Sequence, residues 1–348
     1  MGARPGGLPQ VRRGAVSVYI LRRLFYMLIV LVVISMASFL LIKLPPGDYV
    51  TTRIQQLEQS GGPVNDSELK SLRHQYGLDQ PTTVQYLKWI WNMFHGDLGR
   101  SFMWDRPVTE LIGERLVLTL VISLLSLLLS YLLAIPIGIY SATHQYSFGD
   151  YAFTVFGFVG IAIPGFLIAL ILMFLFYKYF GVSVTGLFSQ GFQQAPWSWG
   201  KVLDLLKHLP IPVVVVGMSG TAYLIRVMRG CLLDELKKQY VVTARAKGVS
   251  ERALLFRYPV RIALNPLVST VGWILPQLIS GETIVALILN LPTTGPLLFN
   301  ALVGQDMYLA GSFIMILSFF TVVGTFVSDM LLMVVDPRIR LEKQGGGV

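Results

Sequence analysis

The sequence is poor in the residues from which catalytic and metal sites are built. It has a single cysteine, Cys231, which excludes a disulfide within the chain. Its four histidines, His74, His95, His144 and His208, are far apart and show no metal-ligand spacing. A Gly-x-x-x-x-Gly-Lys-Ser/Thr loop, the phosphate-binding motif of many ATPases, is also missing. We therefore predict no zinc site, no redox pair and no ATP hydrolysis for this chain.

Charged residues are scarce, whereas apolar residues are abundant. Only 14% of the 348 residues are charged and 54% are hydrophobic, which is more apolar surface than one water-soluble core can hide. Six runs are long enough to cross a hydrocarbon core, which needs about 20 helical residues. They predict transmembrane helices at Leu24–Ile42, Leu116–Tyr140, Phe153–Tyr177, Leu209–Val227, Leu264–Leu289 and Tyr308–Val335. The fold class that we predict is an all-α membrane protein with six transmembrane helices.

The basic residues are unequally divided between the two sides that these spans define. The side made of residues 1–23, 141–150, 226–261 and 336–348 has 17 basic and 6 acidic residues. The side made of residues 43–115, 178–208 and 290–307 has 11 of each. Because basic loops stay in the cytoplasm, both termini are predicted to be cytoplasmic. The net charge of +9 is thus a topology signal and does not predict nucleic-acid binding.

The spans also give the domain organisation. We predict a cytoplasmic segment 1–23, a first helix 24–42, an extracytoplasmic helical loop 43–115, a transmembrane core 116–335 and a cytoplasmic tail 336–348. In the outer loop, Asn65 or Asp66 can cap a helix that runs to Tyr76, and Pro81 can open a second helix. An apolar face on that second helix is predicted to pack on the outer face of the membrane. That face consists of Val84, Leu87, Trp91 and Phe94.

The segment between the fourth and fifth spans, residues 228–261, is basic and prone to helix formation. Leu233, Leu236, Tyr240 and Ala244 line one face of a predicted amphipathic helix, Leu232–Lys247. Gly248 is a natural stop, and Ser250 can cap a second helix that starts at Glu251 and is disturbed at Pro259. The pattern predicts a helix, a bend and a helix in the cytoplasm. These features alone leave open a second interpretation, an amphipathic loop resting on lipid headgroups.

Five ordered stretches of the sequence resemble one family of membrane proteins. The run Tyr240–Arg252, "YVVTARAKGVSER", resembles the cytoplasmic coupling loop of ABC importer permeases, in the branch that serves dipeptides, oligopeptides and nickel. Here Thr243–Ala246 stands where the wider superfamily has Glu-Ala-Ala, and Leu291–Gly295 replaces a Pro-Gly-rich turn. The other similar stretches are Tyr19–Asp48, Tyr76–Phe102, Arg106–Leu120 and Asp336–Arg340.

The resemblance implies a type I ABC permease fold and a B-type permease subunit in the inner membrane of a bacterial or archaeal cell. Such a subunit forms half of a translocation pathway for peptides and is not itself an enzyme. The implied partners are a second homologous permease, one or two cytoplasmic ATPase subunits and an extracytoplasmic substrate-binding protein. ATP and Mg would bind the ATPase subunits. This chain would bind no cofactor. The alternatives are import of oligosaccharides or nickel complexes by the same machinery, or a stand-alone channel or secondary carrier.

Two sets of residues are candidates for function. The resemblance implies a coupling site made of Tyr240, Thr243, Ala244, Arg245, Ala246, Lys247, Gly248, Val249, Ser250, Glu251, Arg252 and Arg257. Proline and glycine at membrane depth are tolerated where protein or a water-filled cavity satisfies the backbone, which suggests a pathway near Gly217, Gly220, Gly281, Glu282 and Thr283. Glu282 either meets the ammonium group of a peptide or forms a structural hydrogen bond with Thr283 or a neighbouring helix. We expect Asp329, near the cytoplasmic end of its span, to pair with a basic residue.

Overall fold

The computed structural model describes residues 13–43, 74, 79–281 and 283–335. Within these ranges the chain is helical, and the β-structure amounts to an isolated bridge between Arg100 and Pro107. The helices are α1 (Arg13–Lys43), α4 (Thr82–Phe94), α5 (Val108–Thr143), α6 (Phe148–Ala162), α7 (Gly165–Phe180), η1 (Gln190–Phe192), α8 (Trp199–His208), α9 (Pro210–Leu236), α10 (Gln239–Ala246), α11 (Glu251–Arg257), α12 (Pro259–Gly281), α13 (Thr283–Ile288), α14 (Thr294–Val303) and α15 (Met307–Val335).

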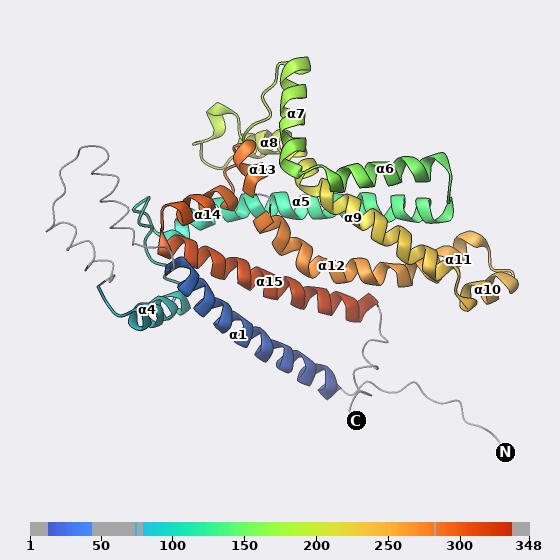
Figure 1. The fold of residues 1–348 in the computed structure, drawn as a ribbon, viewed down its shortest axis with the longest axis horizontal. Coiled ribbons are helices and arrows are strands. Elements are labelled where there is room, and N and C mark those ends of the chain that lie inside the picture. Colours follow the sequence, from blue (N-terminus) through green and yellow to red (C-terminus); the bar gives the residue numbers. More distant parts are fainter. Residues whose placement is uncertain (1–12, 44–73, 75–78, 282, 336–348) are drawn as a thin grey trace.

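The long helices form one bundle. α5 packs along α9, α12 lies between α9 and α15, and α1 flanks α15 (Figure 1). Serines join the first pair, since Ser126 Oγ donates to the carbonyl of Val213 at 3.1 Å and Ser130 Oγ to that of Gly217 at 3.0 Å. Small residues with hydroxyl groups are typical of close helix packing in membranes. Between α5 and α12, Tyr131 Oη donates to the carbonyl of Leu267 at 2.7 Å.

Among the residues that the structure describes, four helices are long and apolar enough to cross a membrane: α1, α5, α9 and α15. They correspond to the first, second, fourth and sixth predicted spans, and α9 begins one residue after the predicted start at Leu209. α5 begins at Val108, eight residues before the predicted start at Leu116, because Val108 and Leu111 are buried against α14 and α15. The predicted fifth span is divided between α12 and α13, and α12 is not among the helices that meet these criteria. The count of six spans is therefore not confirmed.

The third predicted span, Phe153–Tyr177, is divided in the structure into two helices, α6 and α7, at one of the prolines of the sequence that weaken helices at membrane depth. α6 ends at Ala162, α7 begins at Gly165, and the two helices are bent by 105°. The cause is local: Pro164 disfavours helical backbone at the residue before it, and Ile163 is extended with φ −88° and ψ 123°. α7 therefore stands away from the bundle (Figure 1). The pair counts as a fifth span only if it crosses the membrane once.

At the opposite end from α10 and α11, α4 packs against α1. The helix predicted to open at Pro81 is confirmed, and Trp89 is buried against Phe39. The predicted apolar face, Val84, Leu87, Trp91 and Phe94, is exposed, as a surface in contact with lipid would be. The first helix predicted in this loop, which was expected to run to Tyr76, lies outside the described residues.

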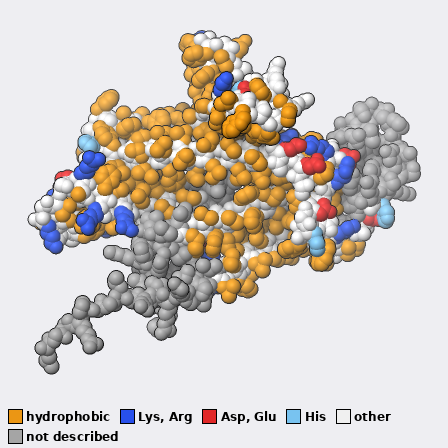
Figure 2. All heavy atoms as spheres, turned by 180° about the vertical axis from the view of Figure 1, so that it is seen from behind, with side chains coloured by type: hydrophobic (Ala, Val, Ile, Leu, Met, Phe, Trp, Pro, Cys, Tyr) orange, Lys and Arg blue, Asp and Glu red, His pale blue; other side chains and the backbone are white. Residues whose placement is uncertain are grey.

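The surface agrees with a membrane orientation. Apolar side chains cover the middle of the bundle, and Lys and Arg side chains gather at the end where α10 and α11 lie (Figure 2). At the other end acidic and basic side chains are mixed (Figure 2). This distribution follows the predicted difference between a basic cytoplasmic side and a balanced outer side.

Candidate functional site

Residues 237–258 form a short helical unit at the end of the bundle, which we call the elbow. It contains α10 and α11 and connects α9 with α12. In Figure 1 it lies at the end of the bundle where α1 begins and α15 ends. The ion pair between Arg23 of α1 and Asp329 of α15, at 2.6 Å, is near the same end. This pair confirms the prediction that Asp329 meets a basic residue.

The elbow starts with a break that the sequence pattern did not predict. A single helix was expected over Leu232–Lys247, but α9 ends at Leu236 and α10 begins at Gln239. Lys238 is extended, with φ −71° and ψ 147°, so the chain turns between the two helices. Tyr240 Oη donates a hydrogen bond back across the break to Glu235. The apolar residues keep a helical spacing across the point where the chain turns between α9 and α10. Periodicity alone therefore cannot show the break.

The end of α10 agrees with prediction. Gly248 has φ +77°, the left-handed conformation in which glycine is favoured, and it follows the last helical turn. Its N–H donates to the carbonyl of Arg245 at 3.0 Å, and the N–H of Val249 donates to that of Ala244 at 3.3 Å. Ser250 then occupies the N-cap position of α11 as predicted, although its side chain makes no capping hydrogen bond.

A small apolar cluster fixes α10 against α11. Val241, Ala244 and Leu254 are buried, and Tyr240, Val249 and Tyr258 pack around them. Ala244 is therefore an internal packing residue of the elbow, where a larger side chain would separate the two helices. The helices consequently hold each other even though each is only two turns long.

An ion pair closes the same two helices from the outside. Arg245 Nε and Nη2 donate to Glu251 Oε1 and Oε2 at 2.5 and 3.0 Å, which is the bidentate geometry that arginine favours. The hydrogen bonds from Arg245 lower the pKa of Glu251, and the same bonds raise the pKa of Arg245. Both side chains are more than half exposed, so this pair orients the helices more than it stabilises them.

The remaining predicted coupling residues lie on the surface of the elbow. Exposed members are Thr243, Arg245, Ala246, Lys247, Gly248, Ser250, Glu251, Arg252 and Arg257. Four of these nine are basic and one is acidic. The predicted site is thus one continuous, mainly basic surface built on a small apolar core, with a geometry suited to protein contact.

The predicted pathway residues lie in different surroundings. Gly217 is buried in the packing of α9 on α5, where an added Cβ would come within 3.1 Å of the carbonyl of Ser126. Gly220 is near the Ser130 hydroxyl on the same interface. Gly281 ends α12 and Thr283 begins α13, while Glu282 lies outside the described residues. The two α9 glycines therefore have a packing role, and the pathway remains a prediction.

Sequence reasoning missed two buried carboxylates. Asp150, in the first turn of α6, is 2% exposed and pairs with Arg229 of α9. Asp306, between α14 and α15, is fully buried and accepts hydrogen bonds from Ser101 and Met103. In the sequence both acids count only as charges of predicted loops. For Asp150 the sequence does indicate a helix start, because the residue follows Ser147 at an N-cap position. A local pattern of this kind cannot identify Arg229 as its partner.

The described residues contain no group of three or more His, Cys, Asp or Glu side chains that could hold a metal ion.

Comparison with known proteins gives two family matches. Residues 134–341 match the binding-protein-dependent transport system inner membrane component. Residues 16–124 match the N-terminal region of the membrane component of such systems.

Individual relatives are similar over nearly the whole chain. An oligopeptide transport system permease protein of Bacillus subtilis (strain 168) is 34% identical over 325 residues, 93% of this chain and 99% of the relative. A putative peptide transport system permease protein of Brucella abortus (strain 2308) is 31% identical, with the same two shares covered. A peptidoglycan transport system permease protein of Agrobacterium fabrum is 30% identical over 94% of this chain and 99% of the relative. The chain therefore belongs to the family of binding-protein-dependent transport system inner membrane components.

Proposed function

We propose that this protein is one of two permease subunits of an ATP-driven ABC importer of peptides. The named relatives support the substrate class, because they are permease proteins of oligopeptide, peptide and peptidoglycan transport systems. The two permeases would enclose the pathway between them. Import of oligosaccharides or nickel complexes by the same machinery is the alternative, and a stand-alone channel or secondary carrier is a weaker one.

The proposed mechanism is based on the structure of the elbow. Its two helices share a buried cluster and the Arg245–Glu251 ion pair, so they form a stiff unit attached to α9 and α12. In the proposed transporter the exposed basic surface of the elbow docks on a cytoplasmic ATPase subunit. Movement of that subunit shifts the bundle between two packings, each open to one side of the membrane. A shift in population from 1:99 to 99:1 needs about 5.5 kcal/mol, which a stiff unit transmits and a loose loop does not.

The remaining components follow from the same proposal. ATP and Mg would bind the one or two ATPase subunits, and this chain would bind neither. An extracytoplasmic binding protein would deliver the substrate. Both termini and the elbow would lie in the cytoplasm, in agreement with the excess of basic residues on that side. No nucleic acid takes part.

Cysteine crosslinking tests the docking of the elbow. Replacing Cys231 by serine removes the only native cysteine. Ala246→Cys then places a thiol on the exposed surface of α10, and Leu87→Cys places a control thiol on the exposed face of α4. In the assembled transporter we expect crosslinks to the ATPase from residue 246 and none from residue 87.

Two results would overturn the proposal. One is an elbow thiol that never reaches an ATPase in an assembly that is active in transport. The other is solute movement by the reconstituted chain without any companion subunit. The substrate class has a separate test, which is mass spectrometry of the molecules that co-purify with the cognate binding protein. Recovery of oligosaccharides in place of peptides would change the proposed substrate class and leave the proposed mechanism unchanged.

A further inference from the structure

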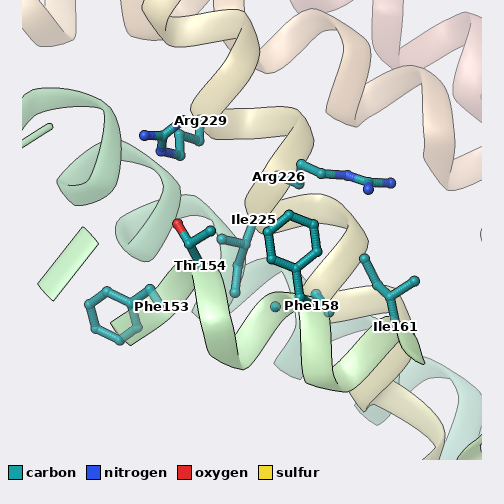
Figure 3. Close-up of a pocket in the computed structure, with 9 residues that line it drawn as sticks. Phe153, Thr154, Phe158, Ile161, Ile225, Arg226 and Arg229 are labelled. Carbon is teal, nitrogen blue, oxygen red and sulfur yellow. The ribbon is translucent and has the colours of Figure 1, made fainter. Parts of the chain in front are cut away.

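A shallow groove lies between α6 and α9 on the surface of the bundle (Figure 3). Its walls are mainly apolar and include Phe153, Gly157, Phe158, Ile161, Ala222 and Ile225. The two helices approach closely at Gly160, where an added Cβ would lie 3.1 Å from the Cβ of Ala222. At Gly157 the nearest atom to such a Cβ is 3.8 Å away, so the absent side chain leaves room for the groove.

Two arginines of α9 line this groove, and their environments differ. Arg229 donates hydrogen bonds to Asp150 and is neutralised by it. Arg226, one helical turn earlier, is exposed and forms no hydrogen bond or ion pair with any residue that the structure describes. Figure 3 shows the two side chains extending in different directions from α9. The groove thus carries one uncompensated positive charge beside an apolar wall.

The depth of Arg226 indicates which anion it meets. α6 begins at Phe148, and its first-turn residue Asp150 pairs with Arg229, which places both groups near the elbow end of the bundle. Arg226 precedes Arg229 by three residues and lies about 4.5 Å further into the bundle. Figure 3 shows the Arg226 side chain extending on the side of Ile161, and an exposed arginine is long enough to turn from there to the headgroup level. Phosphate groups of the adjacent leaflet lie at this level, and basic sites between helices on the cytoplasmic side bind such headgroups.

We propose that the groove binds one anionic phospholipid of the cytoplasmic leaflet. Its phosphate would contact Arg226, and the start of an acyl chain would lie along Phe158 and Ile161, which are 58% and 42% exposed. A hydrated peptide in a water-filled pathway suits these walls less well, because they are apolar on both helices. The proposal uses the membrane orientation given above and depends neither on the substrate nor on the coupling role of the elbow.

Lipid retention by the intact transporter tests this site. The assembled complex is purified and placed in nanodiscs of phosphatidylglycerol or phosphatidylcholine, and the retained lipids are counted by native mass spectrometry. We expect the wild type to retain phosphatidylglycerol and to lose phosphatidylcholine. Arg226→Gln should lower retention about fivefold, since one basic side chain at the surface has an effect of that order. Arg226→Lys should keep most of it, because the charge remains.

Two further variants separate this site from general surface charge. Arg261→Gln removes another exposed arginine, on α12 near the elbow, and should leave retention unchanged. Gly157→Val fills the groove and should lower retention although Arg226 is intact. Monodisperse elution and normal assembly with the other subunits show that each variant is folded.

The proposal fails if Arg226→Gln retains phosphatidylglycerol as the wild type does, or if Arg261→Gln loses it equally. It also fails if phosphatidylcholine is retained equally well, since the site would then have no preference for an anion. Displacement of the lipid by inorganic phosphate alone would contradict the role of the apolar wall. A crosslink from residue 226 to an acidic side chain of the second permease would assign Arg226 to a protein interface.

Discussion

Arg229 of α9 holds the carboxylate of Asp150 through two hydrogen bonds, Nε to Oδ1 at 2.8 Å and Nη2 to Oδ2 at 2.9 Å. The Asp150 side chain is 3% exposed, and the residues are 79 positions apart in the sequence. The backbone N–H of Tyr146 donates a third hydrogen bond to the same carboxylate at 3.1 Å. The pair therefore fixes the start of α6 to α9 beside the groove.

Arg229→Gln should destabilise the bundle strongly. It leaves a buried carboxylate without its cation, and removal of one partner from a buried pair costs about 3–5 kcal/mol. The double variant Asp150→Asn/Arg229→Gln should regain most of that loss, because no charge stays buried. Thermal unfolding of the purified protein measures both. Arg106→Gln, which breaks an exposed pair with Glu114 at 2.6 Å, is the control and should change the melting temperature little. A double variant no more stable than the single one would contradict this account.

Gly248→Val should uncouple transport from ATP hydrolysis while assembly stays largely intact. A β-branched residue at φ +77° is strained by about 1–2 kcal/mol per residue, which favours a different bend between α10 and α11. An added Cβ meets no atom within 4 Å, so the effect is conformational and not a clash. The ratio of substrate imported to ATP hydrolysed in proteoliposomes is the measurement.

Gly96→Val is the matched control for this substitution. Gly96 has φ +79° and equally open surroundings, but it follows α4 at the opposite end of the bundle. It should carry a similar strain and leave the transport-to-ATP ratio unchanged. Normal uptake by Gly248→Val, or equal uncoupling by Gly96→Val, would remove the elbow from the mechanism.

Reversing one charge of the elbow pair should lower coupling, and reversing both should restore part of it. In Arg245→Glu two acids face each other across the bend, so α10 and α11 separate, whereas Arg245→Glu/Glu251→Arg rebuilds the attraction. Because Arg245 lowers the pKa of Glu251, the pair persists above the ordinary glutamate pKa and is lost as pH falls through the lowered value. The measurement is the ratio of substrate imported to ATP hydrolysed. High salt should reduce the effect of the charge reversal on this ratio, because salt screens exposed charges. If the double variant couples transport to ATP hydrolysis no better than Arg245→Glu does, the ion pair does not hold α10 against α11.

Asp306 should give stability a pH dependence of the opposite sign. Burial raises its pKa above 3.8, and hydrogen bonds from Ser101, Met103 and Leu309 offset only part of that increase. The folded protein therefore holds this proton more tightly than the unfolded chain. The stabilisation is complete below the ordinary pKa and is lost as pH rises through the raised pKa.

Comparison with a variant isolates this group from the other carboxylates. The difference in melting temperature between wild type and Asp306→Asn should shrink as pH rises from the ordinary aspartate pKa through the raised pKa of Asp306. The variant itself should be less stable at low pH, because asparagine cannot offer acceptor atoms to both Ser101 Oγ and Leu309 N in the same way. A difference that grows with pH would show that the carboxylate is held in its charged form.

The sequence by itself determined the features that depend on local chemistry. Long apolar runs identify α1, α5, α9 and α15 as helices able to cross a membrane, because each span must satisfy its own backbone hydrogen bonds. Gly248 and Ser250 mark the bend between α10 and α11, since one favours positive φ and the other a helix start. Pro164 marks the bend between α6 and α7, because proline disfavours helical backbone at the residue before it.

Only the tertiary structure decided which distant groups meet. The partners of Asp150 and Asp306 lie 79 and 205 residues away, and the break after Leu236 interrupts a continuous apolar pattern. The four basic residues exposed among the predicted coupling residues are visible in the sequence, but their common surface exists because Val241, Ala244 and Leu254 pack together beneath it. Periodicity records which face of one helix is apolar, whereas the partner of that face is chosen by packing over the whole bundle.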